Sequence, residues 1–147
     1  MTSVIPSTAQ ETVRQYVAAL EQGNWTAIAA HPGLSETLQH FPAMLAAFPD
    51  LHHTFEQEIV AGEMVCTVVS AYGTHRATFL GIPPTGKPVQ FMVLGIDHVV
   101  DGKVVQHWAL PDWMSLIHQL GASIEPPSVG AKEPQSATSV SSNPQHL

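Results

Sequence analysis

The sequence is poor in cysteine and in basic residues, and each shortage excludes a class of function. Cys66 is the single cysteine, which excludes an internal disulfide and any metal site built from several thiolates. The five lysines and arginines are scattered along a chain of net charge −7, so no basic surface for a phosphate backbone is expected. We therefore do not expect nucleic acid as a partner.

Long apolar runs are also missing from the sequence. No stretch of 18 or more apolar residues occurs, and the opening MTSVIPSTAQ lacks the basic start and apolar core of a secretion signal. We therefore expect a protein of the cytoplasm without a membrane-spanning segment. A chain of 147 residues with 44% apolar content is long enough for one domain with a hydrophobic core.

Helical periodicity dominates the first third of the chain. Apolar residues recur there at helical spacing, namely Val13, Tyr16, Val17 and Leu20. This spacing predicts a helix that ends at Gly23. Shorter helices are expected over 24–31, capped by Asn24, and over 35–48, where Pro42 marks a kink or a late start.

From residue 54 the period changes from helical to alternating. Four strands are predicted, over 54–61, 64–72, 88–100 and 103–110. The last two are nearly all apolar and joined across Asp101-Gly102, so we expect both of their faces to be covered. A closing helix is expected between Asp112 and Gly121.

This order of elements predicts an α+β fold over residues 1–121, with helices packed on a curved antiparallel sheet that encloses a pocket. Residues 122–147 are rich in Pro, Ser, Ala and Gln and have almost no large apolar side chains. Such a composition cannot bury enough apolar surface to fold, so a disordered tail is expected there.

Three stretches of the second half carry a family resemblance. They are THRATFLGIPPTGKPV (74–89), GIDHVVDGKVVQHW (95–108) and LIHQLG (116–121). They resemble the SnoaL-like polyketide cyclases, or ester cyclases, of the nuclear-transport-factor-2-like superfamily. The resemblance implies a cone-shaped α+β fold around an apolar pocket, homodimers or higher oligomers through the sheet, and no cofactor. It also implies an aldol ring closure, begun when a carboxylate removes an acidic C–H proton from a polyketide ester.

The sequence departs from this family at the site that the resemblance implies. The cyclases have an acid two residues after the histidine that matches His107, and here that position is Ala109, which cannot take a proton. A Gln and a His of the preceding strand fall on Val93 and Gly95. The short polar strand usual after His31-Pro32 is also missing, so one pocket wall is expected to be absent or rebuilt.

Asp97 and His107 are the candidate catalytic residues, acting as base and orienter. Burying a carboxylate in an apolar strand is costly without a partner, which favours a pocket role for Asp97. A three-residue loop over 100–102 would place Val99 opposite Lys103 and make Asp97 and His107 diagonal neighbours on one face. A two-residue turn would place them on opposite faces, and the hypothesis would fail.

Seven further residues are expected along a substrate pocket, namely Tyr16, His75, Val93, Gly95, Trp108, Ala109 and Asp112. Several have structural alternatives: Tyr16 has core spacing on its helix, and Asp112 immediately before a helix is typical of an N-cap. His107 could be a buried histidine bonded to the backbone. The nine histidines show no i, i+4 or His-x-His spacing, so no metal site is expected.

Two functions remain after this comparison. The first is a cofactor-free enzyme of cyclase, isomerase or lyase type that acts by proton transfer on an apolar, polyketide-like carbonyl compound. The alternative is a non-catalytic protein that binds an apolar small molecule on the same fold, because Ala109 cannot act as the usual acid. An epoxide hydrolase would need an Asp–Arg–Asp arrangement, for which only Arg14 and Arg76 are available.

Overall fold

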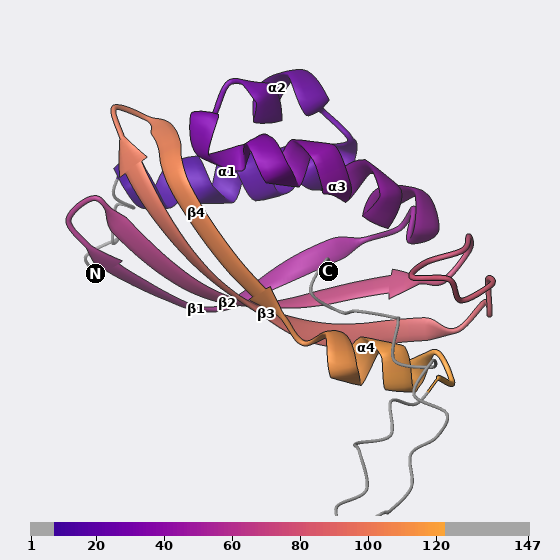
Figure 1. Ribbon diagram of the computed structural model, residues 1–147. Helices are drawn as coiled ribbons and strands as arrows, with labels where there is room; N and C mark the ends of the chain where they lie inside the picture. The colour runs from indigo at the N-terminus through magenta and orange to yellow at the C-terminus, as the bar shows by residue number, and fades with distance from the viewer. Residues whose placement is uncertain (1–7, 123–147) are drawn as a thin grey trace, which may run out of the picture.

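Four antiparallel strands form one curved sheet in the computed structural model, which describes residues 8–122 (Figure 1). The strands are β1 (His52–Ala61), β2 (Met64–Thr74), β3 (Pro88–Val100) and β4 (Lys103–Pro111). Each pairs with its neighbours in the chain, in the order β1-β2-β3-β4. All four strands predicted from the alternating pattern are confirmed.

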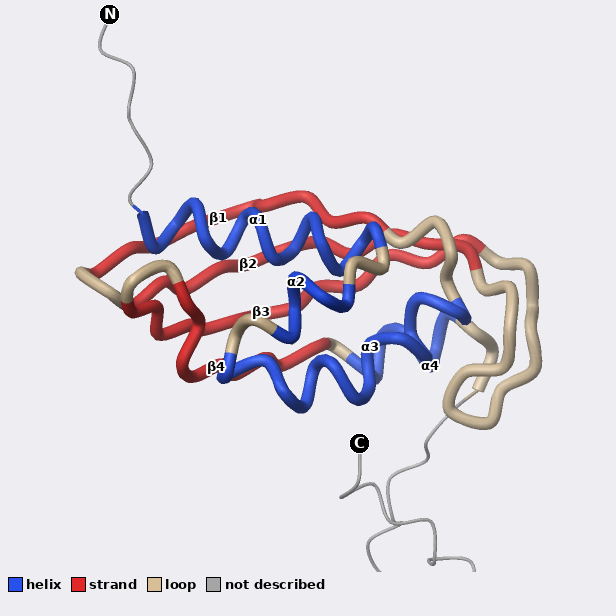
Figure 2. The backbone as a smooth tube through the Cα atoms, turned by 90° about the horizontal axis from the view of Figure 1, so that it is seen from above, coloured by secondary structure: helices blue, strands red, loops and turns tan. Residues whose placement is uncertain are grey.

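Helices cover one face of this sheet (Figures 1 and 2). They are α1 (Thr8–Gln22), α2 (Trp25–Ala29) and α3 (Ser35–Ala47), with a 3₁₀ turn, η1 (Pro32–Leu34), before α3. The last helix, α4 (Trp113–Gln119), follows β4 and lies beside β3, where the Gln119 side chain bonds the Gln90 backbone. The Asn24 side chain caps α2 as expected, accepting a hydrogen bond from the Ala27 N–H. Because α3 begins at Ser35, Pro42 lies inside it and does not mark a late start.

The core lies between the helices and the sheet, in two clusters. One includes Val13, Tyr16, Leu20, Ile28, Leu34, Val65, Val99 and Val104. The other includes Phe48, Leu51, Ala71, Phe91, Leu116 and Leu120. Tyr16 therefore has the core position that its helical spacing predicts. The α+β class and the packing of helices on a curved antiparallel sheet are likewise confirmed.

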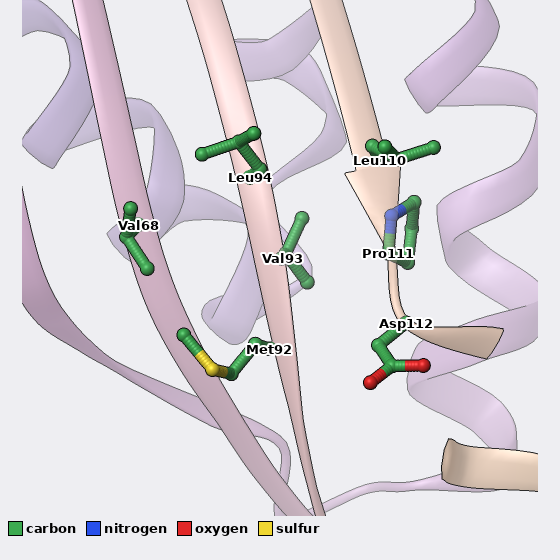
Figure 3. A pocket seen from close by; sticks show the side chains of 7 residues that line it. All are labelled: Val68, Met92, Val93, Leu94, Leu110, Pro111 and Asp112. Atoms are coloured by element: carbon green, nitrogen blue, oxygen red, sulfur yellow. The ribbon is translucent and has the colours of Figure 1, made fainter. Parts of the chain in front are cut away.

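The opposite face of the sheet, here called the outer face, is open to solvent. It exposes Met92, Leu94, Ile96, Trp108 and Leu110. A shallow apolar groove of about 490 Å³ lies where β4 ends, lined by the outer-face residues Val68, Met92, Leu94 and Leu110 and by Val93, Pro111 and Asp112 (Figure 3). The expectation that β3 and β4 are covered on both faces is wrong for the single chain, because α1, α2 and α3 pack against the other face.

The predicted tail, 122–147, lies outside the described residues except for Ala122. Within the described part of the chain, no helix is both long and apolar enough to cross a membrane.

Candidate active site

Asp97 and His107 lie directly opposite each other on β3 and β4. The hairpin that joins these strands turns through two residues, Asp101 and Gly102, whose φ angles are both positive, 49° and 75°. Positive φ at both central residues is the signature of a type I′ turn. The three-residue loop that the sequence favoured is therefore wrong.

A β-bulge in β4 shifts, by one residue, the strand register that follows from this two-residue turn. Val99 pairs with Val104, but the next pair is His98 with Gln106, so Val105 has no partner on β3. One extra residue moves every following side chain of β4 to the other face. The bulge thus brings His107 to the face of Asp97, although the turn has only two residues.

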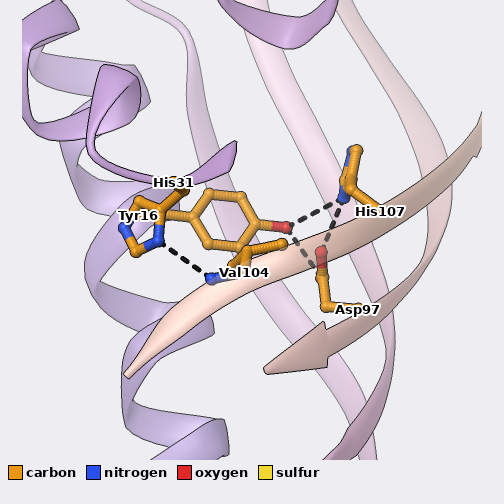
Figure 4. A network of polar contacts seen from close by, with 5 residues as sticks. All are labelled: Tyr16, His31, Asp97, Val104 and His107. Carbon is orange, nitrogen blue, oxygen red and sulfur yellow. Dashed lines mark hydrogen bonds and ion pairs between the residues drawn. The ribbon is translucent and has the colours of Figure 1, made fainter. Parts of the chain in front are cut away.

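The Asp97 carboxylate is completely buried and has two hydrogen-bond donors (Figure 4). His107 Nδ1 lies 2.7 Å from Oδ1, and the Tyr16 hydroxyl donates to Oδ2 at 2.8 Å. An unpaired carboxylate in such a place would carry a large desolvation penalty. These two bonds explain how an otherwise apolar strand accommodates the acid.

The bond to Asp97 determines which nitrogen of His107 carries the proton. A carboxylate can only accept, so Nδ1 is the donor, and Nε2 of the neutral imidazole is the unprotonated nitrogen. The His107 side chain keeps 16% of its surface exposed, whereas Asp97 has none. The arrangement therefore combines a partly accessible imidazole with a buried carboxylate that orients it.

Tyr16 of α1 completes this cluster. Burial raises the pKa of the Tyr16 hydroxyl well above its ordinary value of 10, and the charge and hydrogen bond of Asp97 raise it further. The hydroxyl therefore stays protonated, and its proton points at Asp97. A longer contact of 3.5 Å joins the Tyr16 oxygen to His107 Nδ1. The shorter hydrogen bond of the Tyr16 hydroxyl is therefore the one to Asp97.

Comparison with known proteins agrees with the resemblance carried by residues 74–121. The sequence model of the SnoaL-like polyketide cyclases matches residues 2–120. The chain belongs to the SnoaL-like polyketide cyclase family.

Individual relatives are moderately similar. Aklanonic acid methyl ester cyclase DnrD of Streptomyces peucetius is 28% identical over 136 residues, which cover 78% of this chain and 92% of DnrD. The putative polyketide cyclase IdmH of Streptomyces antibioticus has a TM-score of 0.67 at 27% identity, covering 79% of this chain and 100% of IdmH. AclR of Streptomyces galilaeus, a putative hydroxylase, has a TM-score of 0.70 at 25% identity, covering 77% and 95%.

The positions where this SnoaL-like chain lacks the family's polar groups lie on the Asp97 face. Gly95 pairs with Ala109, and Val93 pairs with Pro111. Because side chains alternate along a strand, these residues follow Asp97 and His107 on the same face. Ala109 is exposed, so the side chain on this face two residues after His107 is small and uncharged.

Two residues expected along the pocket lie elsewhere in this SnoaL-like fold. Trp108, expected along the substrate pocket, pairs with Ile96 on the outer face and is 52% exposed, so it does not lie with Asp97 and His107. The alternation that brings His107 inward turns its neighbour outward. The Asp112 carboxylate accepts a hydrogen bond from the Ser115 N–H at 3.1 Å, which makes it the N-cap of α4.

His75 lies at the other end of the sheet from the catalytic candidates. It follows β2, in which Val65 pairs with Asp97, so roughly 30 Å of extended strand separates it from that pair. His75 is completely buried and stacks on Phe48, and its Nδ1 accepts a hydrogen bond from the Thr85 N–H at 3.1 Å. Its Nε2 is a buried atom without a hydrogen-bond partner among the described residues.

Two residues without an assigned role in the sequence analysis, His31 just before η1 and Gly33 within it, contact the β4 backbone near the site. The Val104 N–H donates to His31 Nδ1 at 3.0 Å, and Gly33 lies against the β4 backbone. The signal that could have found them is the break in the family pattern after His31-Pro32. Within residues 8–122, no three His, Cys, Asp or Glu side chains are grouped so that they could hold a metal ion.

Proposed function

We propose that this chain is a cofactor-independent enzyme that transfers a proton on an apolar, polyketide-like carbonyl compound. The observation that carries the proposal is the bond between His107 Nδ1 and the buried Asp97 carboxylate. It leaves Nε2 unprotonated and able to accept a proton from a substrate. Membership of the SnoaL-like polyketide cyclase family and the similarity to an aklanonic acid methyl ester cyclase support the substrate class.

In this proposal His107 is the base and Asp97 is the orienting residue, the reverse of the roles expected from the sequence. Both Asp97 oxygens already accept hydrogen bonds, and the side chain has no exposed surface, so no substrate carbon can approach it. The carboxylate instead stabilises the imidazolium that forms when Nε2 takes a proton. A buried Asp–His pair thereby replaces the carboxylate that Ala109 lacks.

The proposed reaction is an intramolecular aldol closure. His107 Nε2 removes a proton from a carbon between two carbonyl groups, and the C–H electron pair becomes an enolate. The enolate carbon attacks a third, more distant carbonyl of the same molecule, forming a C–C bond, and the imidazolium returns its proton to the resulting alkoxide. No electron donor or acceptor is needed, because the product is an isomer of the substrate.

Deuterium incorporation from heavy water into a panel of polyketide-like ketones and keto esters tests this proposal. We expect exchange above the buffer rate, falling about 10²–10⁴-fold in His107→Gln, the range of general-base catalysis. The matched control is His98→Gln, which changes a β3 histidine bonded to the exposed Glu63. Exchange that persists at the native rate in folded His107→Gln would remove His107 from the mechanism.

The second candidate function is ligand binding without turnover. Ala109 favours it, because this exposed residue cannot act as the acid that the family resemblance implies at its position. Members of the panel that bind and are recovered unchanged, with no exchange by the native protein, would support this alternative.

We also propose that the outer face binds a second copy of the chain. Its exposed centre, formed by Met92, Leu94, Ile96, Trp108 and Leu110, carries no charged side chain. Two copies of a chain of net charge −7 could meet there without opposing like charges. Sedimentation should show a native dimer, and Leu110→Glu should shift it to monomer. The control, Gln39→Glu on α3, should not, and a monomeric native chain at tens of micromolar would contradict the proposal.

A further inference from the structure

The register of the β3–β4 hairpin decides whether Asp97 and His107 meet at all. Continued without interruption from its two-residue turn, the pairing would place Gln106 opposite Asp97 and His107 opposite Ile96. His107 would then lie on the outer face. The unpaired Val105 is the single residue that prevents this outcome.

The 3₁₀ turn η1 contacts β4 at this bulge. On one side of the bulge, the Val104 N–H donates to His31 Nδ1 at 3.0 Å (Figure 4). Burial lowers the pKa of His31, with a further contribution from Lys103, so Nδ1 stays an acceptor at neutral pH. This bond gives an amide donor of the edge strand a partner outside the sheet.

Gly33 contacts the bulge itself. A Cβ on Gly33 would lie 2.6 Å from the Val105 carbonyl carbon and 2.7 Å from the Gln106 nitrogen. Both are main-chain atoms, so neither can turn aside as a side chain would. Only a residue without a side chain lets η1 approach the bulged backbone this closely.

We propose that His31 and Gly33 form a register clamp, which holds the Val105 bulge in place and so keeps His107 facing Asp97. Both are positioning residues, since neither touches Asp97 or His107 directly. Their catalytic importance rests on the proposed function, but the register they hold is a structural property that can be measured separately. The clamp occupies the place where the sequence analysis expected a missing pocket wall.

Nuclear magnetic resonance of protein labelled with ¹⁵N-histidine tests the clamp without any substrate. The imidazole proton between His107 and Asp97 should give a downfield signal, assigned by its absence in His107→Gln. In Gly33→Ala we expect this signal to fall about tenfold, because the added methyl group forces the bulged backbone to move. Trp108 fluorescence should shift to the blue, since a slipped strand would turn Trp108 toward the helices. Ser35→Ala, at an exposed position two residues further on, is the control and should change neither signal.

Two variants at His31 test the clamp with less disturbance of the backbone than Gly33→Ala. Asn can place its carbonyl oxygen near the position of Nδ1, so His31→Asn should keep the downfield signal and His31→Leu should lose it. The His31 pair decides the matter if Gly33→Ala does not fold, as judged by circular dichroism. An undiminished signal in folded Gly33→Ala, or equal signals in His31→Leu and His31→Asn, would overturn the clamp.

Failure of the clamp and failure of the proposed function give different results. If the clamp is wrong, the variants keep the His107–Asp97 signal and the native protein still exchanges deuterium into substrate. If the proposed function is wrong, the variants lose the signal as expected while the native protein shows no exchange.

Discussion

His107 and His75 lie at opposite ends of the sheet, and their imidazoles carry the proton on opposite nitrogens. At His107, the Asp97 carboxylate accepts from Nδ1, which leaves Nε2 as the acceptor. At His75, the Thr85 N–H donates to Nδ1, so the proton lies on Nε2. His107 can therefore accept a proton from a ligand, whereas neutral His75 presents a donor.

This difference teaches that the partner of a buried histidine decides its chemistry more than burial does. His75 is the more deeply buried of the two and has no charged hydrogen-bond partner in the described part of the chain. His107 has a carboxylate partner that fixes its tautomer. The comparison predicts that loss of the carboxylate has the largest effect and loss of His75 the smallest.

Removing the Asp97 carboxylate should remove the feature that distinguishes His107 from His75. Asp97→Ala leaves the Tyr16 hydroxyl and the His107 Nδ1–H unpaired in the core, and we expect a loss of about 3–5 kcal/mol in the free energy of unfolding. Urea denaturation measures this loss. Glu63→Ala, which removes an exposed carboxylate bonded to His98, is the matched control and should cost under about 1 kcal/mol. A similar cost for both variants would contradict the pairing described here.

Removing one donor to the carboxylate should have a smaller effect. Tyr16→Phe deletes the hydroxyl that bonds Asp97 Oδ2, and we expect a loss of about 1.5–3 kcal/mol, typical of a hydrogen bond to a charged group. Because the second bond, from His107, remains, deuterium exchange should stay within about tenfold of native. Tyr72→Phe is the control, since its hydroxyl contacts only the exposed Gln90 in the described structure, at 3.4 Å. A complete loss of exchange in folded Tyr16→Phe would show that Tyr16 acts on the substrate.

A third histidine, His53, shows the effect of burial through the pH dependence of stability. Burial lowers the pKa of His53 from 6.5, although its partner Glu21 opposes the shift. The unfolded chain therefore gains a proton at a higher pH than the folded chain does. The free energy of unfolding should keep the whole contribution of His53 above about pH 6.5 and should fall as the pH decreases below that value.

Thermal midpoints across this pH range measure the effect. His53→Gln should give a shallower decrease toward acid than the native chain, and His40→Gln, at an exposed position of α3, should not. His31, whose pKa burial also lowers, contributes in the same direction, so some slope should remain in His53→Gln. Identical slopes in the native chain and His53→Gln would exclude His53 as a source.

The smallest effect is expected at the other end of the sheet. His75→Phe keeps the stacking on Phe48, removes the acceptor for the Thr85 N–H and also removes the unpaired Nε2–H. These changes oppose each other, so the free energy of unfolding should change by less than about 1 kcal/mol. Exchange should equal that of the native protein. A large fall in exchange with an unchanged fold would give His75 the substrate contact that the family resemblance implies.

Local sequence patterns were sufficient to predict the elements of this fold. Nearly continuous apolar runs over 88–100 and 103–110 predicted both strands of the hairpin, and Asp112 predicted the start of α4. These features depend on near neighbours in the chain, and the observed bounds differ from the predicted ones by two residues at most. The cost of an unpaired buried acid also identified Asp97 correctly as a residue with a partner.

The geometry of the site could not be predicted in the same way, because it depends on contacts between distant residues. The turn at Asp101-Gly102 alone gives the register that separates Asp97 from His107. The bulge that reunites them lies against His31 and Gly33, some 70 residues earlier.

The two hydrogen bonds of Asp97 connect residues at very different separations in the sequence. Asp97 and His107 are ten residues apart, so their bond can form with the hairpin, on the microsecond scale of local strand pairing. Tyr16 and Asp97 are 81 residues apart, and their bond requires α1 to close over the completed sheet. Closing so long a segment is slower, and it must precede burial of the acid. During refolding, the histidine should therefore acquire its carboxylate partner while still in water, and protection of the pair from solvent should come last.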